Sequence, residues 1–151
     1  MLKKLIMSLK MNPSNKDLSN DIKLVKHYIK DLSFENLQDI NNQTQLNNEV
    51  KITDNIKAIY QSYNNDSFSV LLKYSCDCYN FQNDKKIFIL EIDYLGLLKI
   101  INRDSYSQDL LTSNGCIILY PFLRSIIEDI TAKGGPFKIS LKNLEFNLTK
   151  D

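Results

Sequence analysis

The sequence predicts an α+β domain in which antiparallel strands are followed by amphipathic helices. Two observations support this prediction. Apolar residues alternate with polar ones in two stretches between residues 68 and 100, and from about Ser105 onward they recur at spacings of three and four. A period of two indicates a half-buried strand, whereas spacings of three and four indicate a helix with one apolar face.

The first part of the chain contains less regular patterns. Residues 36–49 are polar and rich in asparagine, which predicts a loop between an N-terminal element and the body of the domain. Residues 50–53 alternate briefly between apolar and polar. Residues 56–63 fit either a strand or a helix, so the pattern leaves their structure open.

The central stretches predict a hairpin. One apolar face of the first strand is formed by Phe68, Val70, Leu72, Tyr74, Cys76 and Cys78, and the polar segment "FQND" follows as a turn. The next strand has one apolar face formed by Phe88, Leu90, Ile92, Tyr94, Leu98 and Ile100. Its other face carries Glu91, Asp93 and Lys99, but also Ile87, Ile89, Leu95 and Leu97. This second face is too apolar for full solvent exposure, so we expect part of it to be covered.

Helical spacing governs the last third of the chain. "SYSQDLL" begins with a possible serine cap. The spacing then predicts an amphipathic helix over 117–132, with Pro121 in its first turn, where a missing N–H is tolerated. Gly134 and Gly135 are expected to end this helix, one of them at positive φ, and Pro136 to prevent its continuation.

Composition limits the possible function classes. The 151 residues include 19 basic and 18 acidic side chains, which gives a net charge of +1 and no argument for nucleic-acid binding. The apolar run near the N-terminus is too short for a secretory signal. No run of ~18 consecutive apolar residues occurs, so no transmembrane helix is expected. We therefore expect a cytoplasmic protein with a flexible extension over 1–21 and a single domain over 22–151.

Residues that often carry chemistry form no recognisable catalytic or metal-binding motif. Cys76, Cys78 and Cys116 are odd in number and are expected to be buried, reduced thiols. The single histidine, His27, has no evident catalytic companion in the sequence. No nucleotide-binding loop or metalloprotease motif is present either. We therefore expect no enzymatic activity, no cofactor and no metal.

Four segments in order resemble the SecB family of protein-export chaperones. "HYIKDLSFEN" (27–36) is similar to the family's opening strand, and "IFILEIDYLGLLKI" (87–100) to a strand that ends in a glycine and an apolar pair. "LYPFLRSIIEDITAKGG" (119–135) resembles its F-P-[FY]-A-R helix with a glycine stop, and "LKNLEFNL" (141–148) its C-terminal P-[IV]-[ND]-F-x-x-L motif. Together the resemblance extends from Ile22 to Leu148.

The sequence also departs from the family pattern. Family members are usually strongly acidic, whereas this chain is near neutral. Gly115-Cys116 replaces a cysteine-proline pair expected before the helix, and Leu123-Arg124 replaces alanine-arginine. After the helix, the family order Gly-Gly-Phe-Pro becomes Gly-Gly-Pro-Phe in this chain. The chain ends at Asp151, where relatives continue into a further helix and a tail. This difference leads us to expect an effect on client binding more than on the fold.

The resemblance implies a four-stranded antiparallel sheet and assembly as a homotetramer, a dimer of dimers. It also implies a chaperone that works without ATP, binds unfolded preproteins and delivers them to the translocation ATPase SecA. By motif match, the SecA-binding residues become Asp31, Glu35 and Glu91, with Ile89 as an apolar neighbour. The client-binding residues remain unassigned.

Two alternatives remain open from the sequence. One is a SecB-like chaperone dedicated to a toxin–antitoxin pair, which a neighbouring toxin gene would indicate. The other is a small enzyme whose site is assembled around His27, which a deep polar pocket at that residue would indicate.

Overall fold

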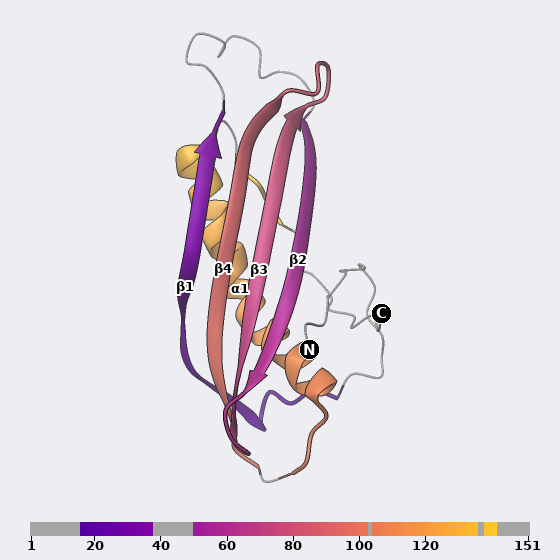
Figure 1. Cartoon of the computed structure of the whole chain (residues 1–151), viewed down its shortest axis with the longest axis vertical. Coiled ribbons are helices and arrows are strands. Elements are labelled where there is room, and N and C mark those ends of the chain that lie inside the picture. Colours follow the sequence, from indigo (N-terminus) through magenta and orange to yellow (C-terminus); the bar gives the residue numbers. More distant parts are fainter. Residues whose placement is uncertain (1–15, 38–49, 103, 136–137, 142–151) are drawn as a thin grey trace.

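The computed structural model describes residues 16–37, 50–102, 104–135 and 138–141. These residues form a four-stranded sheet and a long helix: β1 (Ile22–Asn36), β2 (Val50–Ser62), β3 (Ser67–Asn80), β4 (Lys86–Ile100) and α1 (Gln108–Gly134). The strands lie in the order β1-β4-β3-β2, and every neighbouring pair is antiparallel (Figure 1). The structure thus confirms the predicted α+β fold with its antiparallel four-stranded sheet. It also assigns residues 56–62, which the pattern left open, to a strand.

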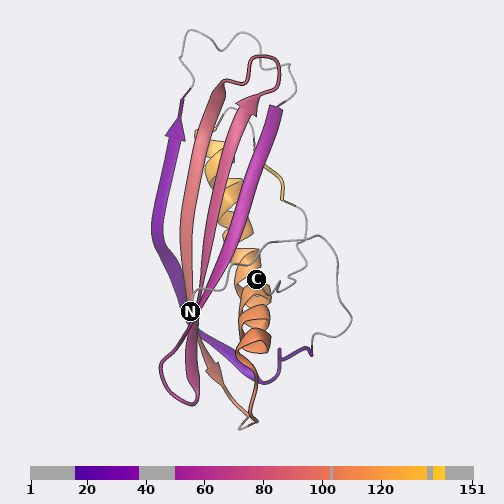
Figure 2. The same cartoon turned by 45° about the vertical axis from the view of Figure 1, so that its right-hand side comes forward.

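The two faces of the sheet have different environments. α1 crosses one face diagonally, and within the described part of the chain no element covers the other (Figures 1 and 2). The alternating side chains of β3 and β4 that the sequence assigned to the core lie beneath α1, and residues such as Phe68, Leu72 and Leu90 are at most 1% exposed. The hydrophobic core therefore lies between the sheet and the helix, and the opposite face, called the outer face below, is free to carry function.

The helix differs from its predicted form in length. Ser107 caps its N-terminus, and its side-chain oxygen accepts a hydrogen bond from the Leu110 N–H. The two helical segments that the sequence suggested are one continuous helix, so Pro121 lies in its interior and Gly115-Cys116 also lies inside it. A proline interrupts one backbone hydrogen bond of a helix. Burial of residues on both sides of Pro121, including Cys116 and Leu123, offsets this loss.

The end of the helix also differs from the prediction. Gly135 is the C-cap, as expected from the glycine pair, but its φ is −92° and its ψ is 167°, which is an extended conformation. No described glycine has positive φ, so the prediction of a left-handed glycine cap is wrong. The chain instead leaves the helix in an extended form, and the Thr131 hydroxyl accepts a hydrogen bond from the Ile139 N–H.

Two glycines allow the helix to approach the sheet closely. A Cβ atom on Gly96 of β4 would lie 2.7 Å from Leu119 Cδ1, and one on Gly115 of α1 would lie 2.6 Å from Val70 Cγ2. Both distances are too short for a carbon–carbon contact. Each glycine therefore faces a large apolar side chain across the interface, and the helix and sheet pack together through these pairs.

The segment before β1 packs against the start of α1. Residues 111–116 are all buried, which one helix face alone cannot explain. The sheet covers one side of this turn, and Leu18, which is 0% exposed, belongs to the same core. Packing therefore begins at least four residues before the expected domain boundary at residue 22.

The three cysteines and more than half of the apolar part of α1 are buried inside the structure. The three cysteines are free and buried, as predicted, and burial raises the pKa of the Cys76 thiol to about 11. α1 is long and apolar enough to cross a membrane by length and composition, but 56% of its apolar window is buried inside the structure. We therefore interpret α1 as the core helix of the domain.

Candidate partner-binding surface

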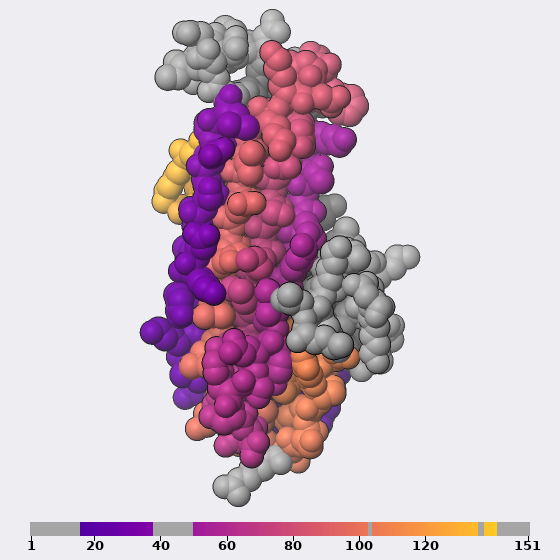
Figure 3. All heavy atoms as spheres, in the orientation of Figure 1, coloured from indigo at the N-terminus to yellow at the C-terminus, as the bar shows by residue number. Residues whose placement is uncertain are grey.

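Cross-strand pairing arranges the outer face in rows that run from β1 across β4 and β3 to β2. Residues directly opposite one another in a sheet share a face, so the register defines each row. Successive rows contain Tyr28, Leu95, Leu71 and Ile59; then Asp31, Asp93, Lys73 and Lys57; then Ser33, Glu91, Ser75 and Asn55; and then Glu35, Ile89, Asp77 and Thr53. Figure 3 shows this face of the sheet in space-filling form.

The structure brings all four predicted SecA-binding residues together. Asp31 lies opposite Asp93, Glu35 lies opposite Ile89, and Glu91 lies between them on the neighbouring strand. Asp31, Glu35 and Glu91 are exposed and Ile89 is half-buried. The four residues therefore form one contiguous patch on β1 and β4.

A bulge in β1 is responsible for this alignment. The register shifts between Ile29 and Asp31, so one extra residue of β1 is inserted opposite β4 at this point. The Asp31 carboxylate accepts a hydrogen bond of 3.0 Å from the Leu32 N–H at the bulge. Beyond it, Asp31 and Glu35 share the outer face at an even spacing, as the sequence had suggested.

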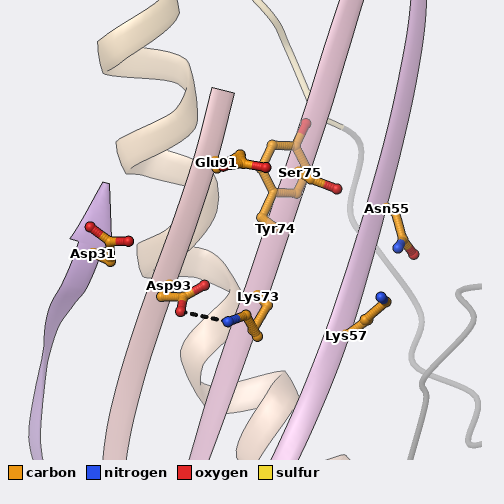
Figure 4. A pocket seen from close by; sticks show the side chains of 8 residues that line it. All are labelled: Asp31, Asn55, Lys57, Lys73, Tyr74, Ser75, Glu91 and Asp93. Atoms are coloured by element: carbon orange, nitrogen blue, oxygen red, sulfur yellow. Dashed lines mark ion pairs between the residues drawn. The ribbon is translucent and has the colours of Figure 1, made fainter. Parts of the chain in front are cut away.

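Sequence reasoning did not assign a role to Asp93 and missed Lys73. Alternation places Asp93 on the same face as Glu91, but only the sheet order shows which strands lie beside it. Lys73 Nζ lies 2.8 Å from Asp93 Oδ2, and this ion pair is partly exposed to solvent (Figure 4). We call Asp31, Glu35, Glu91 and Asp93 the acidic half of the outer face.

Charges change sign across one row of the sheet. Asp31 and Asp93 are followed by Lys73 and Lys57, so two carboxylates lie beside two ammonium groups. These four residues, with Glu91, line a hollow of about 270 Å³. A hydrogen bond with Asp93 raises the pKa of Lys73, and the charges of Asp93, Asp31 and Glu91 act in the same direction. Lys73 therefore lies in the field of all three carboxylates.

The outer face is apolar beyond this row of charges. Tyr28, Leu95 and Leu97 line a second hollow of about 360 Å³, together with Lys26, Tyr63, Ser67 and Ser69. Tyr28 is 45% exposed and Tyr63 is 54% exposed. The apolar excess that the sequence showed on this face of β4 thus forms a surface next to the acidic half.

His27 belongs to an aromatic cluster on the other face of the sheet. Its Nδ1 and Tyr94 Oη form a hydrogen-bonding pair 2.5 Å apart, and its ring centroid lies 4.3 Å from that of Phe122. These neighbours give the ring a structural role between β1 and α1. Among the described residues, His, Cys, Asp and Glu form no group of three that could hold a metal ion.

Comparison with known proteins decides the family. The sequence profile described as preprotein translocase subunit SecB matches residues 15–149. The chain belongs to the SecB family. Curated relatives named protein-export protein SecB include that of Orientia tsutsugamushi strain Boryong, 32% identical over 79% of this chain and 74% of the relative, and that of Sphingopyxis alaskensis, 31% identical over 91% and 78%. Membership makes this chain a protein-export chaperone of the SecB type.

A solved structure supports the fold independently of sequence. A SecB-like chaperone of Mycobacterium tuberculosis, in complex with a ChAD peptide from the HigA1 antitoxin, superposes with a TM-score of 0.67. The match covers 85% of this SecB chain and 94% of the other, at 14% identity. At this level of identity the similarity establishes a shared fold, and the antitoxin peptide is a property of the other protein.

Proposed function

We propose that this SecB protein is a cytoplasmic chaperone that holds unfolded preproteins without using ATP and delivers them to SecA. The observation that supports this proposal most strongly is the acidic half of the outer face. It gathers four carboxylates on two neighbouring strands of a chain whose net charge is +1. Such a local concentration of one sign, in a near-neutral protein, favours a basic partner over non-specific binding.

SecA docking uses exposed carboxylates and a small apolar contact. Asp31, Glu35 and Glu91 point to solvent, where they attract basic groups of the partner before contact. Ile89 lies beside Glu91 along β4 and directly opposite Glu35, so an apolar side chain lies within the charged patch. Charge then supplies orientation and rate of association, and Ile89 supplies apolar area that is buried on contact.

Client holding requires exposed apolar side chains and no chemistry. Large apolar residues are exposed on several elements: Val25, Tyr28 and Ile29 on β1, Tyr63 and Phe81 in connections, and Ile117 and Phe122 on α1. Unfolded segments bind such surfaces and open strand edges through apolar burial and main-chain hydrogen bonds. The sequence contains no phosphate-binding loop, so the proposed binding cycle has no nucleotide step.

A homotetramer accounts for part of this exposed apolar surface. β1 is an edge strand, and in the described chain its backbone pairs only with β4. Its side chains Val25, Ile29 and Leu32 are exposed by 37–55%. Phe122 is also 40% exposed, on α1. Edge strands and apolar helix faces of this kind are the surfaces that permanent assemblies bury. We propose that β1 and α1 form the two interfaces of a dimer of dimers.

Three free, buried thiols support the cytoplasmic location, because a reducing compartment preserves them.

Aggregation of an unfolded client tests the chaperone activity. A chemically denatured preprotein is diluted into buffer with and without the SecB protein, and light scattering is followed with and without ATP. The proposal predicts equal suppression in both conditions. Suppression that appears only with ATP, or no suppression at equimolar protein, would contradict it.

Co-purification decides between the export role and the alternative dedicated to a toxin–antitoxin pair. The tagged protein is isolated from its own cells and its partners are identified by mass spectrometry. Recovery of SecA with several preproteins supports the export role. Recovery of one toxin–antitoxin pair, without SecA, would replace it with the dedicated role.

A further inference from the structure

We propose that Lys73 is a specificity-determining residue of the outer face. It forms an ion pair with Asp93, and it thereby limits both the affinity of a basic partner and the part of the sheet that this partner can cover. This inference rests on the proposed docking of SecA and concerns the same surface. It follows from the position of one lysine among carboxylates, where the surface is otherwise suited to attract cations.

Lys73 neutralises one of two carboxylates that lie opposite one another in the charged row. Lys73 Nζ lies 2.8 Å from Asp93 Oδ2, and Asp93 lies directly opposite Asp31 on the next strand. Two carboxylates directly opposite one another repel, and Lys73 on the far side of Asp93 relieves that repulsion. The lysine thus holds a carboxylate that a basic group of the partner would otherwise contact.

The order of the strands separates positive from negative charge along this row. Lys73 lies directly opposite Lys57 on the edge strand β2, so the β2–β3 side of the row is positive and the β1–β4 side is negative. A basic partner is attracted to the acidic half and repelled at Lys73. In this row the acidic half therefore ends between β4 and β3, within the hollow that Lys73 and Asp93 both line.

The ion pair contributes little to folding, which makes its effect on binding measurable. The side chains of Lys73 and Asp93 are 46% and 21% exposed. Partly exposed pairs of this kind contribute a small part of the stability of a domain. Neutral variants of either residue are therefore expected to fold and to keep the assembly of the wild-type protein.

Opposite changes in SecA affinity on neutralising Lys73 and on neutralising Asp93 provide the test. Affinity for purified SecA is measured by isothermal titration for wild type, Lys73→Gln, Asp93→Asn and the double variant. Lys73→Gln is expected to bind about three- to tenfold more tightly at low salt, because one repulsive charge is removed and Asp93 is released. Asp93→Asn is expected to bind more weakly, because Lys73 then carries an unpaired charge. The double variant restores the net charge and is expected to bind like wild type.

Salt and a distant lysine provide the controls. Both single-variant effects are expected to shrink between about 50 mM and about 300 mM salt, since exposed charges are screened. Lys99→Gln removes one positive charge, as Lys73→Gln does, and lies on the outer face of β4. Lys99 is six residues from Asp93 and thus ~20 Å away, so this control is expected to leave the affinity for SecA unchanged. Equal or weaker binding by Lys73→Gln, with the fold intact, overturns the inference.

A charge-only probe separates this inference from the export role. An oligo-arginine peptide is titrated against the same variants. If SecA fails to bind wild type while the peptide shows the opposite responses, the role of Lys73 stands and SecA is the wrong partner. If SecA binds wild type but Lys73→Gln leaves its affinity unchanged, SecA docking stands and the inference about Lys73 is wrong.

Discussion

Asn114, in the first half of α1, accepts a hydrogen bond of 3.0 Å at its Oδ1 from the backbone N–H of Leu18, which lies 96 positions earlier in the chain. Its Nδ2 donates to the carbonyl oxygens of Lys16 and Leu110, at 3.2 Å and 3.0 Å. One buried amide therefore joins the segment before β1 to the helix. This contact contributes to the burial of residues 111–116 on every side of the helix.

Replacement of Asn114 by alanine is expected to release this segment. The change leaves the buried Leu18 N–H without its partner, and a buried group without a partner costs about 1–3 kcal/mol. The free energy of unfolding should fall by this amount, and amide exchange of Leu18 should become much faster. Ser125→Ala, at an exposed position of the same helix, serves as the control. Unchanged exchange at Leu18 would show that the amide does not hold the segment.

A side chain at Gly96 is expected to destabilise the fold while Leu119 is present. Gly96→Ala places a Cβ atom 2.7 Å from Leu119 Cδ1 and 3.0 Å from its Cγ, and overpacking of this kind costs about 1–3 kcal/mol. In a Leu119→Ala background the same change should cost less, because the clashing atoms are absent. Urea denaturation of the four proteins measures the coupling. An equal cost in both backgrounds would contradict the close helix–sheet contact.

Stability is expected to fall at alkaline pH because of the buried thiols. Burial raises the pKa of Cys76 to about 11 and the pKa of Cys78 and Cys116 to about 12. The native state thus holds these protons more tightly than the unfolded state, in which thiols titrate near ~8.5. Their contribution is complete below that pH and is lost as pH rises toward the native values. Urea midpoints should therefore decrease from about pH 9 upward, and less so in Cys116→Ala. A midpoint that stays constant up to about pH 10.5 would contradict this prediction.

The mass of the assembly tests the proposed interfaces on β1 and α1. Light scattering of the purified protein at micromolar concentration should give the mass of four chains. Ile29→Lys places a charge among the exposed apolar residues of β1 and is expected to give smaller species with the fold retained. Lys133→Gln, at an exposed position near the end of α1, serves as a control that should leave the mass unchanged. A monomeric wild-type protein would exclude the tetramer.

Strand and helix periods predicted much of the fold because burial on one face produces them. The alternation in β3 and β4 identified the core side chains, and the helical spacing identified an amphipathic helix over 117–132. In the structure, Leu119, Leu123 and Ile127 form the buried stripe of this part of α1. Pro121 misled the assignment of the helix start, because local rules favour proline in a first turn. Tertiary burial on both sides of Pro121 decides the outcome, and no local pattern contains that information.

The candidate surface was predictable only in part. Alternation placed Glu91 outward, and the family motif supplied Asp31 and Glu35. The register of β1 against β4, which aligns these residues, depends on a bulge that leaves no clear sequence signal. Lys73 joins the surface through the order of strands in the sheet. Such long-range neighbours come from topology, so sequence spacing alone could not reveal the ion pair with Asp93.

The affinity of SecA for wild type and for Glu91→Lys, measured at two salt concentrations, tests the central claim most directly. Glu91 lies in the middle of the acidic half and is exposed, so its reversal should leave the fold and the assembly intact. Asp129→Lys makes the same charge reversal on an exposed position of α1 and serves as the control. The account predicts that Glu91→Lys weakens SecA binding by a few kcal/mol at low salt and by less at high salt, while the control binds like wild type. Equal affinity of wild type and a folded Glu91→Lys protein would contradict the claim that the outer face docks SecA.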